Sequence, residues 1–128
     1  MDHNADFRYD LEWGKIGENT VAEIVAGDKT EVKSERDIWV RTGNHFVETE
    51  SRGKPSGICT THAKFWSINF YQQDKFCFNI TKTVEDLKQI VLRYKAKKVA
   101  GGDDDTSRGI LVPITALTKP NPLINYDY

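Results

Sequence analysis

The sequence predicts an α/β fold in which a central mixed β-sheet is flanked by helices. Three observations lead to this prediction: several short segments rich in aromatic and β-branched residues, one amphipathic helical segment near residue 90, and a chain of 128 residues with no internal repeat. A chain of this length is in the usual size range of one domain with one core. We therefore expect a single domain over residues 1–128, built from packed layers of strands and helices.

The first half of the chain predicts a helix followed by a pair of strands. Apolar positions in residues 14–26 fit one side of a helix, and Gly27 is a suitable stop just beyond it. Residues 29–36 and 44–51 are predicted to be strands, and Thr42-Gly43-Asn44 is a turn signal between them.

The second half predicts another strand pair, a helix and a last strand. Residues 65–71 and 75–80 are expected to be strands around a short polar turn. The helix after them begins at Thr83, where an acid three residues later resembles a capping box. Residues 109–117 are a strand candidate, and the tail of about residues 119–128, with two prolines, is expected to be extended.

The composition excludes several classes of protein. No apolar run approaches the ~18 residues needed for a membrane span, and the N-terminus lacks the pattern of a secretory signal. The two cysteines, Cys59 and Cys77, are too few for a disulfide scaffold. The net charge of -1 argues against a protein that coats nucleic acid by bulk electrostatics. We expect an intracellular, cytoplasmic protein with no membrane association.

An acid-x-lysine triplet, Glu31-Val32-Lys33, carries the first chemical signal. Because side chains alternate along a strand, Glu31 and Lys33 lie on the same face, about 6.6 Å apart. Hydrolysis of a phosphodiester needs acidic oxygen ligands for Mg²⁺ and benefits from a nearby cation. One residue of the triplet can therefore hold a metal while the other approaches the attacking water or the scissile phosphate.

Further acids surround this triplet in the sequence. Glu48 and Glu50 share a face of the next predicted strand, and they would lie beside the triplet if the two strands pair. Glu18, on the preceding helix, is the natural remaining ligand. Asp28 and Asp37 are substitutes for a different register. The cluster, rather than any single acid, indicates a metal-dependent site.

The segment after the acidic strand combines cations, hydroxyls and glycines. Arg52, Lys54 and Ser56, with Thr60 a little further on, have the chemistry of a phosphate-contacting loop. A tight connector with solvated charges is an equally good interpretation of the same residues.

Residues 28–34, 42–48 and 50–61 together resemble a group of small phage-encoded or phage-related nucleases of the PD-(D/E)XK superfamily. The arrangement is also similar to that of Holliday-junction-resolvase-like proteins. The resemblance covers about residues 7–70, and Thr42-Gly43-Asn44 with Gly53-Lys54-Pro55-Ser56-Gly57 is its most specific part.

The resemblance implies a restriction-endonuclease-like core, Mg²⁺ or Mn²⁺ as cofactor, and cleavage of DNA, including branched DNA. Residue by residue, it implies an acid at Glu18, the acid-x-lysine motif at Glu31 and Lys33, and a supporting acid at Glu48 or Glu50. Junction-resolving relatives act as dimers, so a homodimer is one alternative, and a phage-encoded relative would act in the host cell.

Two other functions stay open beside the nuclease. One is a nuclease-fold module without a working site, which binds nucleic acid or a protein partner. The other is an unrelated α+β interaction protein whose acids are merely exposed. The single histidines His45 and His62 lack metal-ligand spacing and are interpreted as structural or surface residues.

Overall fold

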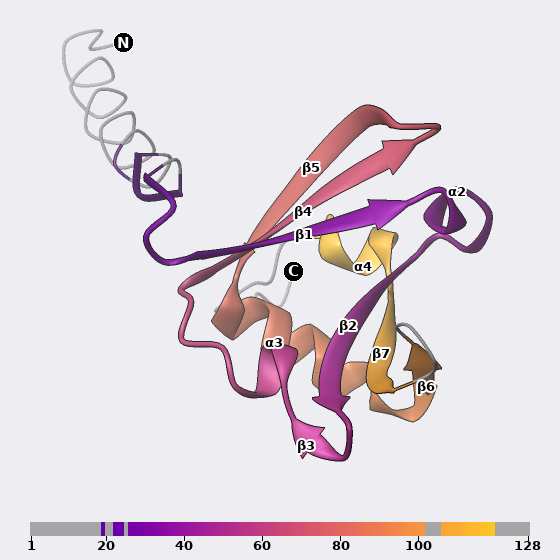
Figure 1. The fold of residues 1–128 in the computed structure, drawn as a ribbon. Helices are drawn as coiled ribbons and strands as arrows, with labels where there is room; N and C mark the ends of the chain where they lie inside the picture. The colour runs from indigo at the N-terminus through magenta and orange to yellow at the C-terminus, as the bar shows by residue number, and fades with distance from the viewer. Residues whose placement is uncertain (1–18, 20–21, 25, 102–105, 120–128) are drawn as a thin grey trace, which may run out of the picture.

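The computed structural model describes residues 19, 22–24, 26–101 and 106–119 (Figure 1). The strands are β1 (Thr30–Arg36), β2 (Asn44–Ser51), β3 (Lys54–Pro55), β4 (Phe65–Gln72), β5 (Lys75–Thr83), β6 (Lys98–Gly101) and β7 (Ser107–Pro113). The helices are α2 (Ile38–Thr42), α3 (Val84–Arg93) and α4 (Ile114–Leu117), with 3-10 turns η1 (Gly57–Cys59) and η2 (Lys95–Lys97). Of the helix predicted over residues 14–26, the described positions 19, 22–24 and 26 are helical.

The predicted α/β class, with a mixed sheet and flanking helices, is confirmed, but the strands form two sheets instead of one. A three-stranded sheet has the order β1-β4-β5, in which β1 and β4 are parallel and β4 and β5 antiparallel. A four-stranded antiparallel sheet has the order β3-β2-β7-β6. The layout is therefore a mixed sheet and an antiparallel sheet with a few helices beside them.

The expected pairing of the first two strands is wrong. β1 pairs with β4, whereas β2 pairs with β7 and β3. Helix α2 occupies the link where a simple turn was predicted, and it ends at Gly43 with the left-handed φ of 70°. Figure 1 shows β1 and β2 meeting near α2 and diverging away from it. The two strands therefore face each other at an angle, with no ladder between them.

The core lies between the two sheets and α3. Strand β4 contributes Trp66, Ile68 and Phe70, which alternate with the more polar Ser67 and Asn69. The other core residues come mainly from the second sheet and from α3, and include Val47, Val84, Leu87, Ile90, Val91, Ile110 and Val112. This packing holds the sheets together, because neither sheet alone buries its inner face.

The helix predicted at Thr83 is confirmed as α3. The Thr83 side chain accepts a hydrogen bond from the backbone N–H of Asp86 at 3.1 Å, and Glu85 and Asp86 occupy the first turn. Both features favour a helix start, because they satisfy a free N–H and place negative charge at the positive end of the dipole.

The last predicted strand, residues 109–117, is only partly correct. Strand β7 ends at Pro113 and the chain continues as the short helix α4. Proline has no N–H for a sheet ladder, which explains the end of the strand at this point. Of the tail predicted to be extended, residues 120–128 lie outside the described residues. Within the described part of the chain, no helix is long and apolar enough to cross a membrane.

Candidate functional site

Strand β1 turns one charged face toward the second sheet. Glu31, Lys33 and Glu35 are half-buried, whereas Val32 and Ser34 between them are exposed. The period of two along the strand accounts for this alternation. The prediction that Glu31 and Lys33 share a face is confirmed by the contact of Lys33 Nζ with Glu31 Oε1 at 3.7 Å.

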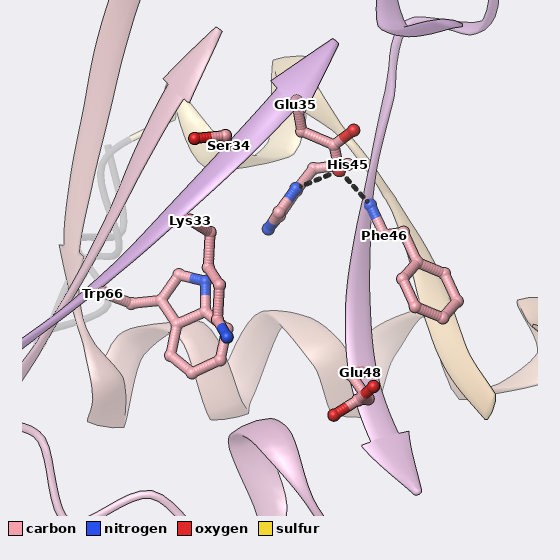
Figure 2. A pocket seen from close by; sticks show the side chains of 7 residues that line it. All are labelled: Lys33, Ser34, Glu35, His45, Phe46, Glu48 and Trp66. Carbon is pink, nitrogen blue, oxygen red and sulfur yellow. Dashed lines mark hydrogen bonds and ion pairs between the residues drawn. The ribbon is translucent and has the colours of Figure 1, made fainter. Parts of the chain in front are cut away.

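A cavity of about 300 Å³ lies where β1 and β2 diverge (Figure 2). Its lining residues are Lys33, Ser34, Glu35, His45, Phe46, Glu48 and Trp66. Lys33 and Glu48, which were predicted to act together, therefore border one space although they belong to different sheets.

Lys33 lies over the indole of Trp66, with Nζ 5.2 Å from the ring centroid. Figure 2 shows its side chain running alongside that ring. The ring face attracts the ammonium group, and Glu31 attracts it from its own strand. Lys33 is 39% exposed, so its charge remains available to a bound molecule.

Glu48 is held by two hydroxyl groups. Ser56 Oγ donates to Oε2 at 3.0 Å, and Ser107 Oγ donates to Oε1 at 2.7 Å. A carboxylate has about four lone-pair positions, so both oxygens can accept further contacts. Glu48 is therefore an oriented carboxylate in the cavity wall.

Gly57 brings the following loop against Glu48. A Cβ atom built at Gly57 would lie 2.2 Å from the Glu48 carbonyl oxygen, and the residue has a φ of 57°. The close approach that glycine permits at this position is therefore to the Glu48 backbone.

Glu35 and His45 form a pair in the cavity wall. His45 Nδ1 lies 2.5 Å from Glu35 Oε1, and the same oxygen accepts the backbone N–H of Phe46 at 2.9 Å. His45 is 2% exposed, in agreement with its structural interpretation. Two buried nitrogens of the lining residues, His45 Nε2 and Trp66 Nε1, have no protein hydrogen-bond partner. Such atoms are rare in folded proteins and occur at functional sites or water positions.

Other predicted acids lie away from this cavity. Glu50 forms an ion pair with Lys98 and lines a separate cavity beside α3. Asp28 is exposed before β1 and lines a third cavity with Glu23. Glu18 lies outside the described residues. Among the described residues, Lys33 and Glu48 line the cavity and Glu31 contacts Lys33, whereas Glu50 and Asp28 lie apart from it.

One residue of the predicted phosphate-contacting loop contacts the wall of the cavity. Ser56 joins it by the hydrogen bond to Glu48. Arg52, Lys54 and Thr60 are exposed, and Arg52 has a positive φ of 52° at the turn between β2 and β3. The side chains of these three residues are therefore accessible to a polyanion bound next to Glu48.

A metal ion at this cavity would find oxygen ligands of the type that Mg²⁺ prefers. Among the described residues, no three His, Cys, Asp or Glu side chains form a group that could hold a metal. Mg²⁺ is commonly bound by only one or two carboxylates, with water and substrate phosphate completing its shell. Glu48, which lines the cavity, fits that limited role, and Glu31 lies outside the lining in contact with Lys33.

An ion pair outside the cavity shifts a carboxyl group. Lys64 Nζ donates to Glu23 Oε2 at 2.8 Å, and this hydrogen bond, followed by the charge of Lys64, lowers the pKa of Glu23 from its ordinary value. Both side chains are more than half exposed, so the pair contributes little to stability.

Two residues around the cavity were missed in the sequence: Glu35 in its lining, and Ser107, which donates a hydrogen bond to Glu48. The alternation that placed Glu31 and Lys33 on one face also predicts Glu35 there, so that signal was present. Ser107 lies 59 positions from Glu48, and no local pattern relates the two.

Comparison of the chain with protein-family models, with curated proteins and with solved structures finds no match in any of the three.

Proposed function

We propose that this protein is a metal-dependent nuclease that hydrolyses phosphodiester bonds in DNA, with its active site in the cavity between β1 and β2. One observation carries the proposal: the Lys33 ammonium and the oriented Glu48 carboxylate line the same cavity, with Glu31 in contact with Lys33. A cation beside two carboxylates is the combination that phosphodiester hydrolysis with a divalent ion uses.

In this proposal the acidic residues bind the metal and the lysine contacts the phosphate. Glu48 and Glu31 would hold Mg²⁺ or Mn²⁺, and a bound ion would supply an activated water and neutralise charge on the phosphate. Glu48 keeps its orientation through the hydroxyls of Ser56 and Ser107. Lys33 offers its ammonium to the phosphate oxygens, where negative charge increases in the transition state. Glu18 is the further ligand that the sequence resemblance implies.

The loop after β2 supplies the contact with the DNA backbone. Arg52 and Lys54 are exposed cations on the turn that precedes Ser56. Phosphate contacts of this kind orient a protein on DNA without reading the sequence. Branched DNA is the substrate that the resemblance implies.

The first test is cleavage of labelled linear, nicked, flapped and four-way-junction DNA in Mg²⁺, Mn²⁺ or EDTA. The wild type is expected to cut at least one substrate only with metal. Lys33→Met, which keeps the side-chain stem on Trp66, is expected to lower kcat by about 10²–10³-fold, the scale measured when one transition-state donor is removed. DNA binding should change much less.

Two acids of the same strand provide the matched comparison. Glu48→Gln is expected to abolish metal-dependent cleavage, whereas Glu50→Gln alters a carboxylate that is paired with Lys98 beside another cavity. Cleavage that survives Glu48→Gln but is lost in Glu50→Gln would show that the assignment of the site to Glu48 is wrong and that Glu50 belongs to it.

The second candidate is a DNA-binding module on the same fold without catalysis. The exposed Arg52 and Lys54 favour it, because they need no metal to contact phosphate. Folded wild type that binds DNA in EDTA and cuts none of the substrates with either metal would select this function over the nuclease.

A further inference from the structure

In the described part of the chain, two hydrogen bonds join β1 to β2, and Glu35 Oε1 accepts both. One comes from His45 Nδ1 at 2.5 Å and the other from the Phe46 backbone N–H at 2.9 Å. The two strands belong to different sheets and share no ladder. Glu35 therefore fastens together two edges that the backbone leaves unpaired.

The position of this link relative to the cavity gives it significance. Glu35 is two residues from Lys33 on β1, and Phe46 is two residues from Glu48 on β2. Each interval is about 6.6 Å along a strand. Figure 2 shows the link at one end of the cavity, with Lys33 and Glu48 further along the diverging strands. A small rotation at the link therefore changes the separation of Lys33 and Glu48.

The surroundings of Glu35 make the link rigid. His45 is 2% exposed and packs its ring against Phe70, with centroids 6.3 Å apart. The Glu35 side chain is 18% exposed. A largely desolvated carboxylate with two donors is held more firmly than a surface ion pair, because water competes less for it.

We propose that Glu35 is a positioning residue, whose carboxylate holds β1 against β2 and thereby sets the separation of Lys33 and Glu48. Its effect on catalysis rests on the proposed nuclease function, whereas its effect on strand separation does not. Opening the two strands by about 10° would move Lys33 by about 1 Å, from the strand rise. A misplacement of 1 Å can cost on the order of 10² in rate.

The kinetic test compares Glu35→Ala with Glu35→Gln. The alanine variant is expected to lower kcat by about 10–100-fold with little change in KM, because Arg52 and Lys54 still bind DNA. The glutamine variant keeps an oxygen for both donors and should recover most of the rate. Thr83→Ala, which removes the cap of α3, is the control for lower stability away from the cavity.

The geometric test needs no activity. Spin labels at Val32→Cys on β1 and Arg108→Cys on β7, with Cys59→Ser and Cys77→Ser, report the separation of the two sheets. Glu35→Ala is expected to lengthen or broaden this separation by about 1–2 Å, and to accelerate amide exchange at Phe46. Glu35→Gln should keep both close to the wild type.

The outcomes separate the two proposals. A wild-type protein that cuts no DNA overturns the proposed nuclease function. The distance between the spin labels still decides whether Glu35 positions β1. Unchanged separation in folded Glu35→Ala overturns the positioning role, even in an active enzyme. In an active enzyme, a loss of kcat no greater than that in Thr83→Ala also overturns it.

Discussion

Replacing Gly57 by alanine tests whether the loop after β2 is pressed against Glu48. A Cβ at this position would lie 2.2 Å from the carbonyl oxygen of Glu48 and 2.9 Å from its carbonyl carbon, so backbone would have to move. The φ of 57° adds a second cost, because a left-handed conformation is unfavourable for alanine by about 1–2 kcal/mol. Forcing an extra methyl group into a packed site costs about 1–3 kcal/mol more.

Gly53→Ala is the matched control in the same loop. Gly53 also has a positive φ, of 79°, but a Cβ there would have nothing within 4 Å. Both variants are therefore destabilised by the left-handed backbone conformation, and only Gly57→Ala adds the steric clash with Glu48. The difference in unfolding free energy should be about 1–3 kcal/mol, from the collision alone.

Urea unfolding followed by circular dichroism measures both variants under identical conditions. We expect Gly57→Ala to unfold at clearly lower urea than Gly53→Ala, with similar slopes. Nuclear magnetic resonance should also show altered signals of Ser56 and Glu48 in Gly57→Ala, because their hydrogen bond spans the displaced loop. Equal destabilisation by the two substitutions would refute the close contact.

Two further predictions concern the edges of the fold. The pKa of Glu23 should lie below that of an ordinary glutamate, and Lys64→Met should raise it, because the hydrogen bond and charge of Lys64 favour the carboxylate. The associated stability is present above the unfolded-state pKa and is lost as pH falls through the lower folded-state pKa. A carboxyl nuclear magnetic resonance titration checks the pKa of Glu23 in both proteins. Thr83→Ala should lower the unfolding free energy by about 1 kcal/mol through loss of the cap, whereas the exposed Thr115→Ala should change it less in the same urea experiment.

The positions of the strands that carry the candidate site could be predicted from local sequence patterns. Residues 44–51 match β2 in full, and residues 29–36 differ from β1 by one position. The alternation along β1 also placed Glu31 and Lys33 on one face, in agreement with their contact. These predictions succeed because strand period and turn residues depend on neighbours in the sequence.

The pairing partners of those strands could not be predicted from the sequence. The pairing of β1 with β4 follows from the packing of Trp66, Ile68 and Phe70 against the second sheet and α3. Helix α2 was missed because its five residues, Ile38–Thr42, are too few for a helical period to emerge. The choice between Glu48 and Glu50 likewise depended on distant partners, Ser107 and Lys98.

By itself, the sequence determined the α/β class, most strand positions, the start of α3 and the shared face of Glu31 and Lys33, because each depends on residues a few positions apart. Only the tertiary structure decided that the strands form two sheets, that Lys33 and Glu48 line one cavity between them, and that Glu35 joins β1 to β2. The physical reason is that core packing and hydrogen bonds between distant residues set strand partners, and a local periodicity contains no information about which edge another strand will meet.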